Sequence, residues 1–326
     1  MSKTAEISVV ISTYNRSRVM LETLDSVLQQ TYRDFEVVVV SDGSTDDTAA
    51  VLKPYVERGQ IRFREQENQG PAATRNTGLA EATGKYICFL DDDDLWSPDK
   101  LAWQVEAWKR APDDCVLVYG YCIWFGEGLE PTPAPETIQP SGKVFKEFCY
   151  KNRIASAGQT MIRTDIAREI GGFDTTLFGP EDWDFWLRLA TQGTFHYEHK
   201  LALKYRLQAK SVSRNIQRMH ENRVRVVQKQ ENSPAAVADP EARTFLQRHR
   251  DIATTQNNVR ITNLTYVRTL QYAVRYKESG QTGKALQILL QGIKEAPWML
   301  RMPEIVRLLM ATLLPQQIKR LLKADK

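Results

Sequence analysis

The sequence contains little cysteine and no long apolar run. Its four cysteines, Cys88, Cys115, Cys122 and Cys149, lack both the close paired spacing of a zinc site and the density of a disulfide framework. The apolar stretch near the N-terminus is only about six residues long, which is too short for a secretory signal or a membrane span. These absences predict a cytoplasmic protein with an ordinary hydrophobic core.

Two phosphate-binding motifs are also absent. The chain shows neither G-x-G-x-x-G nor a Walker A lysine motif. The sequence therefore gives little support to binding of a dinucleotide redox cofactor or to simple hydrolysis of a nucleoside triphosphate.

Length and charge indicate the organisation of the chain. Its 326 residues, 42% of them hydrophobic, suffice for one large domain with an appendage or for two domains. The net charge of +4 hides an asymmetry, because residues 1–200 carry 21 Lys+Arg against 31 Asp+Glu, whereas residues 201–326 carry 23 against 9. A basic C-terminal part suits an anionic surface, such as a membrane leaflet or nucleic acid, or simply a solvated helical face. No nucleic-acid-binding module is visible in it, so nucleic acid is not expected as a partner.

Short β-branched runs alternate with amphipathic stretches through the first hundred residues. Strands are predicted at 7–12, 35–41, 61–66 and 85–90, and a helix follows each of the first three, the last of these helices opening at Pro71. This alternation predicts a parallel sheet with helices on both faces. Ligands of such sheets bind beyond the carboxyl ends of the strands.

Acidic residues gather at those strand ends, in SDGSTDD and LDDDD. Four adjacent carboxylates repel one another, so stability alone does not favour the second run. Closely spaced aspartate oxygens suit a hard cation, Mg²⁺ or Mn²⁺, that bridges them to phosphate oxygens. A second interpretation is that some of these acids cap the next helix, with Ser97 as its N-cap and Pro98 at its first position, and both interpretations can hold together.

Four segments resemble a known family: SVVISTYNR, VVVVSDGSTDDT, GPAATRNTGLAEATGKYICFLDDDDLWSPDKL and GGFDTTLFGPEDWDFWLRLATQG. In this order and spacing they are similar to the family 2 inverting glycosyltransferases, over roughly residues 6–213. The resemblance implies the GT-A fold, a Rossmann-like α/β fold whose mixed, mostly parallel sheet is flanked by helices. It places a catalytic domain at 1–214, and residues 215–326 are predicted to form an α-helical C-terminal extension.

The resemblance implies a nucleotide site made by Ser12, Tyr14, Asp42, Arg75, Asp91 and Asp92. Tyr14 would flank the base, Asp42 would hydrogen-bond its edge, and Arg75 with Asn76 would lie near the nucleotide or its diphosphate. Taken alone, Tyr14 is also compatible with an ordinary loop aromatic, Asp42 with a turn residue, and Arg75 with a solvated helix residue. The places of Tyr14 and Asp42 at neighbouring strand ends favour the site.

Within the acidic run, the family's D-x-D pattern matches Asp91 and Asp93, and another alignment gives Asp92 and Asp93. The member nearest the start of the run would contact the ribose, and the last would coordinate Mn²⁺ or Mg²⁺. Asp94 would support the metal from behind or cap a helix. The resemblance therefore implies a metal site at Asp93 and Asp91.

Inverting transfer also requires a base on the face of the sugar opposite the leaving diphosphate. The family's E-D motif makes Asp182 that base, with Glu181 positioning the acceptor or its loop. Acceptor contacts are expected from Trp183 and Gln159. The alternative is that the acids only complement the dipole of a helix that packs on the core through residues such as Phe185.

The sequence departs from the family at one position. Many relatives carry a histidine in a Y-R-x-H segment that can complete the metal shell, and here Gln208 stands at that place. Gln is a weaker ligand for Mn²⁺, so either a lower metal affinity or the loss of the third protein ligand is expected. Arg206, Ser211 and Ser213 are left as diphosphate contacts in a closing loop. The Q-x-x-R-W motif of processive synthases is missing, which favours transfer of a single sugar.

Helices dominate the predictions for the C-terminal part. Residues 218–230 are predicted to be helical, and after a linker a new helix begins near Asp239 or Pro240. Residues 263–296 resemble a single tetratricopeptide-like hairpin, which cannot bury its face alone. The apolar and basic segment 298–326 contains two prolines and is too interrupted to cross a bilayer. It is expected either to lie on an anionic leaflet or to pack as a C-terminal helix.

The sequence thus predicts an inverting, metal-dependent glycosyltransferase. It would move one sugar from a nucleotide-diphospho-sugar donor, with UDP as the expected nucleotide, to a glycan or polyprenyl-linked acceptor in cell-surface polysaccharide synthesis. The expected location is the cytoplasm, or the inner face of the plasma membrane. A nucleotidyltransferase shares the layered fold but would usually carry glycines in its first loop, which STYNRSR lacks. The alternative from another class is a non-catalytic sugar-nucleotide-binding or scaffold protein.

Overall fold

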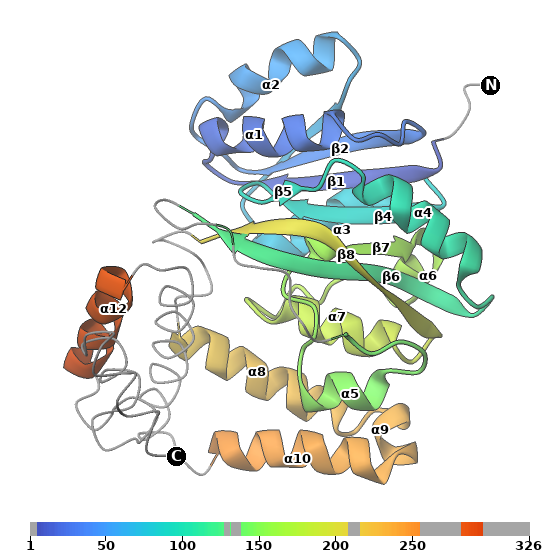
Figure 1. Ribbon diagram of the computed structural model, residues 1–326, viewed down its shortest axis with the longest axis vertical. Coiled ribbons are helices and arrows are strands. Elements are labelled where there is room, and N and C mark those ends of the chain that lie inside the picture. Colours follow the sequence, from blue (N-terminus) through green and yellow to red (C-terminus); the bar gives the residue numbers. More distant parts are fainter. Residues whose placement is uncertain (1–4, 127–130, 132–137, 208–215, 255–281, 296–326) are drawn as a thin grey trace, which may run out of the picture.

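The structure is a computed structural model, and it describes residues 5–126, 131, 138–207, 216–254 and 282–295 (Figure 1). Three predicted features lie outside these residues. They are the loop positions Gln208, Ser211 and Ser213, the first part of the 263–296 hairpin, and the segment 298–326.

The first four predicted strands are present and pair in parallel. They are β1 (Ile7–Thr13), β2 (Phe35–Asp42), β3 (Arg62–Gln66) and β4 (Tyr86–Asp91), in the order β3-β2-β1-β4. The connecting helices are α1 (Ser17–Leu28), α2 (Thr48–Glu57) and α3 (Pro71–Glu81). Val38, Val39 and Val40 of β2 are fully buried, as expected for a strand covered on both faces.

The second half of the sheet was not predicted from the sequence. It adds β5 (Leu95–Trp96), β6 (Cys115–Phe125), β7 (Thr160–Arg163) and β8 (Thr194–Arg206), and the full order is β3-β2-β1-β4-β7-β6-β8-β5. β7 is antiparallel to both β4 and β6, so β6 runs in the same direction as β4, and β8 is parallel to β6. The carboxyl ends of β1, β2, β4, β6 and β8 therefore meet at one edge of a mixed sheet.

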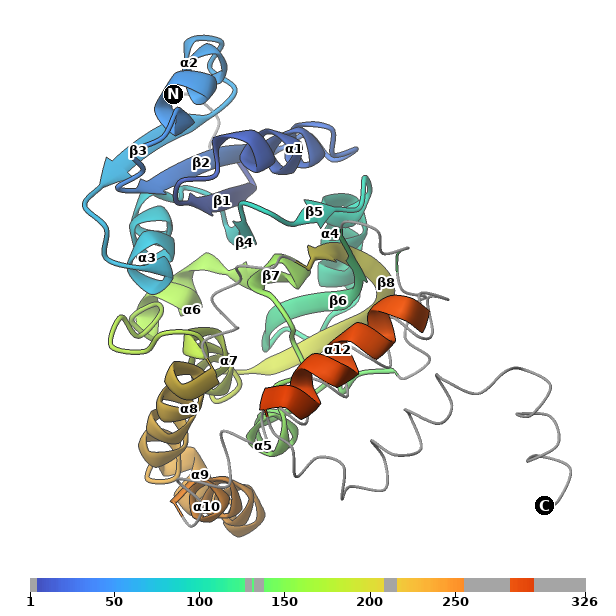
Figure 2. The ribbon, with the colours of Figure 1, turned by 90° about the vertical axis from the view of Figure 1, so that its left-hand side faces the viewer.

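Helices cover both faces of this sheet, as predicted. The remaining elements of the first 200 residues are α4 (Lys100–Arg110), α5 (Phe145–Tyr150), the 3₁₀ turn η1 (Ala157–Gln159), α6 (Thr164–Glu169) and α7 (Glu181–Leu189). Figure 2 shows α3 and α6 on one side of the sheet and α1 and α4 on the other. Two hydrophobic cores result, one under α1, α2 and α4 and a second under α3, α5, α6 and α7.

The helical C-terminal part packs onto the second of these cores. The helices that pack there are α8 (Ile216–Gln230), α9 (Pro234–Ala238) and α10 (Pro240–Thr254), which agrees with the helices predicted at 218–230 and from 240 onward. The C-terminal part also contains α12 (Thr282–Glu295). Val226 of α8 and Leu246 of α10 are fully buried in the core that also holds Phe185 of α7. Buried Asp184 of α7 accepts hydrogen bonds from Lys229 Nζ (3.1 Å) and Gln230 Nε2 (2.9 Å). These contacts fix α8 directly against α7.

No helix among the described residues is both long and apolar enough to cross a bilayer.

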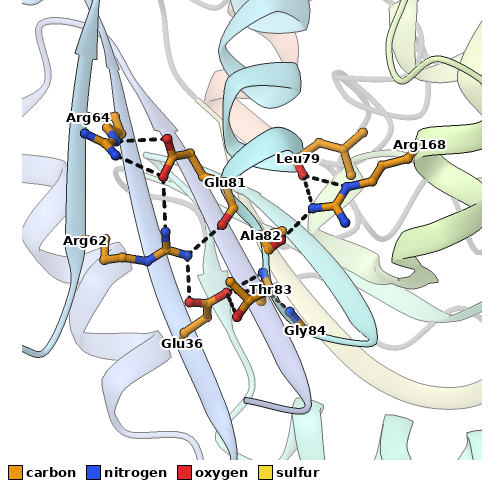
Figure 3. A network of polar contacts seen from close by, with 10 residues as sticks. Glu36, Arg62, Arg64, Leu79, Glu81, Ala82, Thr83, Gly84 and Arg168 are labelled. Atoms are coloured by element: carbon orange, nitrogen blue, oxygen red, sulfur yellow. Dashed lines mark hydrogen bonds and ion pairs between the residues drawn. The ribbon is translucent and has the colours of Figure 1, made fainter. Parts of the chain in front are cut away.

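Arginine side chains anchor the C-terminal end of α3 at the amino edge of the sheet, as Figure 3 shows. Arg62 Nη2 from β3 donates to the Glu81 carbonyl (2.8 Å), and Arg168 Nη2 from α6 donates to the Leu79 carbonyl (2.9 Å). Arg62 also pairs with Glu36 at the start of β2 (2.7 Å). The last carbonyls of a helix have no partner within the helix, so these arginines satisfy groups that would otherwise depend on water. The opposite end of α3 points toward the carboxyl edge.

The prediction that Ser97 caps the helix after the acidic run is wrong. Helix α4 begins at Lys100, with Asp99 at the N-cap position. The Ser97 hydroxyl instead donates to the Leu201 carbonyl of β8 (2.7 Å), and its backbone amide bonds the Ala202 carbonyl (3.2 Å). Ser97 therefore ties the segment after the acidic run to β8.

Candidate active site

A cleft of about 690 Å³ lies at the carboxyl edge of the sheet. Most of the predicted site residues line it: Ser12, Tyr14, Asp42, Arg75, Asp91, Asp92, Asp93, Glu181, Asp182 and Trp183. Sequence positions from 12 to 183 are thus brought together, as the rule for strand ends predicts.

The loop after β1 contributes the rim of the cleft. Tyr14 is 47% exposed, which leaves its ring available to a ligand. Asn15 adopts a left-handed conformation (φ 52°), and its Oδ1 accepts a hydrogen bond from the Thr45 amide (2.7 Å) in the loop after β2. Asparagine tolerates this conformation better than most residues. The bend at Asn15 separates Tyr14 at the rim from Arg16, which reaches back to the acidic run.

Arg16 supplies a positive charge inside the acidic run. Its Nη1 lies 3.3 Å from Asp92 Oδ1 and also pairs with Asp93 Oδ2. The Tyr14 amide donates to the other oxygen of Asp92 (3.2 Å). Burial, together with neighbouring Asp93, nevertheless raises the pKa of Asp92 to about 7, although Arg16 opposes this shift. Burial likewise raises the pKa of Asp93. One arginine therefore does not fully compensate the charge of this run.

Asp94 lies behind the cleft and has a framework role. Its Oδ1 accepts from the Arg206 amide (2.9 Å) and its Oδ2 accepts from Ser156 Oγ (3.3 Å). Arg206, a predicted diphosphate contact, donates from Nε to the Asp93 carbonyl (2.8 Å) and from Nη2 to Glu22 (2.6 Å). Its guanidinium also lies 4.6 Å from the centre of the Phe125 ring. Arg206 is absent from the cleft lining among the described residues and holds the backbone of the acidic run from the side of β8.

Asp42, expected at the base edge, also organises the loop that precedes α3. Its Oδ1 accepts from Gln66 Nε2 (2.8 Å) and from the Gln69 amide (2.9 Å), and its Oδ2 accepts from the Gly70 amide (2.8 Å). Both carboxylate oxygens are thus engaged, although each retains lone pairs. Asp42 still lines the cleft.

Arg75 joins the two groups of carboxylates. It is buried on α3, and its Nη2 lies 2.7 Å from Asp91 Oδ1 while its Nη1 lies 2.8 Å from Glu181 Oε1. The two carboxylates outweigh the cost of burial and raise the pKa of the Arg75 guanidinium. Asn76, the next residue, instead accepts from the Phe173 amide (2.8 Å) and donates to the Phe173 carbonyl (2.8 Å). Arg75 and Asn76 together fix the segment that leads to α7.

Glu181 and Asp182 form the first turn of α7. Glu181 is buried, and its second oxygen accepts from the Gly179 amide (2.6 Å) in the preceding turn. Asp182 accepts a hydrogen bond from the Trp183 amide (2.6 Å) and lines the cleft. Burial and the adjacent charge of Glu181 raise the pKa of Asp182 to about 7, against the effect of Arg75. A carboxylate with this pKa can take up a proton at neutral pH.

The two predicted acceptor contacts have packing roles in the structure. Trp183 is only 4% exposed, and its Nε1 donates to the Phe148 carbonyl (2.8 Å), so it touches the cleft mainly as part of the core. Gln159 is 3% exposed, donates to the Gly120 carbonyl (2.8 Å) and accepts from the Ala155 amide (2.7 Å). The backbone around η1 and β6 thus engages both the oxygen and the nitrogen of the Gln159 side-chain amide.

Several lining residues were not predicted from the sequence: Arg16, Asn68, Trp124, Tyr205, Met219 and Arg223. Arg16 directly follows the STYN segment, so a cation beside two acidic loops was a usable signal. Trp124 and Tyr205 come from strands β6 and β8, which were not predicted. Met219 and Arg223 come from α8, whose position against the cleft depends on tertiary packing alone.

The acidic run fits a hard metal ion that is shared with a bound diphosphate. Among the described residues no group of three or more His, Cys, Asp or Glu side chains is arranged to hold a metal. Asp91, which is 33% exposed, and Asp93 offer two carboxylates at alternate positions. Mg²⁺ and Mn²⁺ are commonly held by one or two carboxylates plus phosphate oxygens and water. The donor set thus suits a metal that arrives with its substrate.

Sequence comparisons identify relatives of this chain. Residues 8–171 match the family model described as glycosyl transferase family 2. TuaG of Bacillus subtilis, a putative teichuronic acid biosynthesis glycosyltransferase, is 31% identical over 214 residues, which cover 64% of this chain and 82% of TuaG. An uncharacterized glycosyltransferase of Rickettsia prowazekii is 28% identical over 62% of this chain and 64% of its own length. Another from Rickettsia bellii is 42% identical over 31% of this chain and 15% of its own length. The chain thus spans less than two thirds of these two Rickettsia proteins.

Solved structures with the same fold include two nucleotide-sugar complexes. S. aureus TarS 1–349 in complex with UDP-GlcNAc superposes with a TM-score of 0.61 at 19% identity, covering 88% of this chain and 92% of TarS 1–349. A mannosyltransferase from Pyrobaculum calidifontis in complex with GDP-Man and Mn²⁺ gives 0.58 at 18% identity, covering 95% of this chain and 85% of the other. At such identities the likeness concerns the fold, and the predicted GT-A architecture is confirmed. Because the family model covers half of the chain and TuaG is matched over most of its length, this chain belongs to glycosyl transferase family 2.

Proposed function

We propose that the protein is an inverting glycosyltransferase that moves one sugar from a nucleotide-diphospho-sugar to a hydroxyl group. One observation carries the proposal: a single cleft contains both the acidic run and the Glu181–Asp182 pair, and Arg75 bridges them by ion pairs to Asp91 and Glu181. A donor held at the acidic run would therefore present its sugar toward α7. Membership of family 2 supports the same activity.

In the proposed reaction, Asp182 removes the proton of the acceptor hydroxyl. The acceptor oxygen forms a bond to the anomeric carbon while the bond from that carbon to the diphosphate oxygen breaks, and the bonding electrons leave with the diphosphate. A positioned general base typically contributes 10²- to 10⁴-fold. Glu181 is held by Arg75 and the Gly179 amide, so its role is to keep Asp182 and the turn before α7 in place.

On the donor side, Tyr14 flanks the nucleotide base and Asp42 hydrogen-bonds the edge of that base. Asp91 to Asp93 hold the ribose and the metal. Mn²⁺ or Mg²⁺, bound by Asp91 and Asp93, would stabilise the negative charge of the leaving diphosphate. The UDP-GlcNAc complex of TarS and the GDP-Man and Mn²⁺ complex of the mannosyltransferase support a metal-assisted nucleotide-sugar donor. We take UDP as the nucleotide because TarS is also known in complex with UDP.

The proposed acceptor is a glycan or a polyprenyl-linked sugar in cell-surface polysaccharide synthesis. The name of TuaG, a putative teichuronic acid biosynthesis glycosyltransferase, supports this class of product. The proposed location is the cytoplasm, with contact to the inner face of the plasma membrane through the basic C-terminal part. Co-sedimentation with anionic liposomes tests that contact, and an equal distribution with and without anionic lipid would contradict it.

Thermal unfolding with nucleotides tests the donor site. UDP, GDP, dTDP and CMP are each added with Mn²⁺, Mg²⁺ or EDTA, and a ligand at 100 times its Kd should stabilise by about 2.7 kcal/mol. The expected result is a shift with one nucleotide that disappears in EDTA and in Asp93→Asn. Asp113→Asn, which changes an exposed aspartate far from the lining, is the matched control and should keep the shift. A folded wild-type protein without any shift would refute the donor site and favour a non-catalytic role.

A further inference from the structure

An aromatic pair forms the far wall of the cleft. Trp124 near the end of β6 and Tyr205 near the end of β8 are register partners, and their ring centres lie 4.6 Å apart at an interplanar angle of 52°. Both side chains are partly buried and both line the cleft. None of the donor or base roles proposed above uses either ring.

The strand order places this pair in the second half of the sheet. Asp42 ends β2, Tyr14 follows β1, Asp91 ends β4, and β7, β6 and β8 come next across the sheet. Tyr205 itself lies next to the acidic run, because Arg206 Nε donates to the Asp93 carbonyl (2.8 Å). Neighbouring strands are about 4.8 Å apart, so where β7 lies between them β6 is about 10 Å from β4, on the side away from β2. A donor that extends from β2 to β4 therefore leaves the Trp124 end of the cleft for a second ligand.

Polar groups also line the cleft near the acidic run. The segment before η1 places Asn152, Ile154 and Ser156 in the lining, and Ser156 is tied to Asp94 by a 3.3 Å hydrogen bond. This segment leads into β7, which lies between β4 and β6. Flat apolar walls with a few polar groups suit a ligand that has both C–H faces and hydroxyls. A neutral pyranose ring has this combination.

The pair is distinct from the adjacent aromatic contact. Phe125 and Arg206, one residue further along each strand, form their own contact at 4.6 Å, and Arg206 is engaged with the Asp93 carbonyl. That contact holds the acidic run, whereas Trp124 and Tyr205 face the cleft.

We propose that Trp124 and Tyr205 form the acceptor-sugar subsite, where a neutral pyranose of a glycan chain stacks beside the reacting centre. The inference rests on the proposed glycosyltransferase function and adds the class of group that binds opposite the donor. It assigns acceptor recognition to β6 and β8 in place of Trp183 and Gln159.

The test measures binding of four neutral tetrasaccharides, built from glucose, N-acetylglucosamine, mannose or galactose, by saturation-transfer difference NMR with UDP and Mg²⁺ present. At least one probe should bind the wild-type protein, and its affinity should fall about tenfold in Trp124→Ala and in Tyr205→Ala. Trp124→Phe keeps a ring and should retain most of the affinity, which also guards against a variant that fails to fold.

Trp108→Ala is the matched control, because Trp108 stacks on Tyr86 with the same 4.6 Å centre distance but outside the cleft lining. It should leave tetrasaccharide binding unchanged. Thermal shifts with UDP and with UDP-GlcNAc are measured for every variant and should match those of the wild-type protein.

Three results would overturn the inference. The first is that no tetrasaccharide binds the wild-type protein. The second is that the wild type and the folded Trp124 and Tyr205 variants bind equally well. The third is loss of the UDP-GlcNAc shift in those variants, which would assign the rings to the donor sugar. If the wild-type protein showed no UDP shift, the proposed function itself would fail. A normal UDP shift without tetrasaccharide binding would refute the subsite alone.

Discussion

Replacing the proposed base should make the protein more stable at neutral pH while removing its activity. The folded structure raises the pKa of Asp182 from 3.8 to about 7 through burial and the charge of Glu181. As pH rises from about 4 to 7, the unfolded chain loses this proton before the folded protein does, so the stability contributed by the protonated carboxyl is progressively lost. Asp182→Asn mimics the protonated carboxyl at every pH and should escape that loss.

The shift of roughly three pKa units sets an upper limit of about 4 kcal/mol, since one unit corresponds to 1.36 kcal/mol. Asp182 borders an open cleft, where water screens its charge, so we expect about 2 kcal/mol at pH 8. For a chain of this size that corresponds to a rise in Tm of about 4 °C. The advantage of the variant should be smaller at pH 5, where wild-type Asp182 already carries its proton.

Thermal unfolding of both proteins at pH 5 and pH 8 measures this difference. Glu181→Gln is the matched control on the neighbouring residue and should destabilise the protein. It removes a buried charged partner of Arg75, so the free energy of unfolding should fall by about 3 kcal/mol. Transfer activity should fall about 10²-fold or more in Asp182→Asn. A variant no more stable than wild type at pH 8, or equally stabilised at both pH values, would refute the electrostatic reasoning.

Three further predictions concern the same cleft. In Arg75→Lys the lysine keeps the positive charge but cannot reach both Asp91 and Glu181. The free energy of unfolding measured in urea should therefore fall by about 2 kcal/mol. An unchanged value would contradict the bridging role of Arg75. Asn15→Ala should lower the free energy of unfolding by about 1 kcal/mol and weaken UDP binding, because alanine disfavours a φ of 52°. Asn15→Gly should recover the conformational part of that loss. Equal losses in both variants would show that the bend is unimportant. The kcat/KM of sugar transfer should rise with an apparent pKa near 7 as Asp182 deprotonates, and a rate that falls between pH 6 and 8 would count against it as the base.

Much of the donor side could be predicted from the sequence because its signals are local. β1 and β2 are runs rich in β-branched residues and β4 is an apolar run, and the polar residues at the ends of these strands meet because parallel strands end at one edge. The strands β6 and β8 escaped prediction because β6 contains Gly120 and their pairing contains register shifts, which break the alternation of a regular strand. Trp124 and Tyr205 could not be assigned to the cleft without those strands.

Other parts of the site depend on where a side chain points, which the sequence does not encode locally. Trp183 and Gln159 stand close in sequence to cleft residues, yet their polar atoms bond the carbonyls of Phe148 and Gly120. Ser97 has the sequence context of an N-cap, but its hydroxyl donates to the carbonyl of Leu201, about a hundred residues away. The place of Arg16 after STYN indicates a cation near the acidic loops, but its partners Asp92 and Asp93 are defined only by the structure.

Helix α3 links the two edges of the sheet. Arg62 and Arg168 hold its last carbonyls at the amino edge, Arg75 holds Asp91 and Glu181 at the carboxyl edge, and about 9 Å of helix separates the two ends. Gly78 lies so close to β1 that a Cβ there would sit 2.1 Å from Val10 Cγ1, so the helix packs directly against the sheet. The helix is therefore held at both edges of the sheet. Substitutions around Glu81 at the amino edge act on the support of the helix that carries Arg75, while the lining of the cleft stays the same.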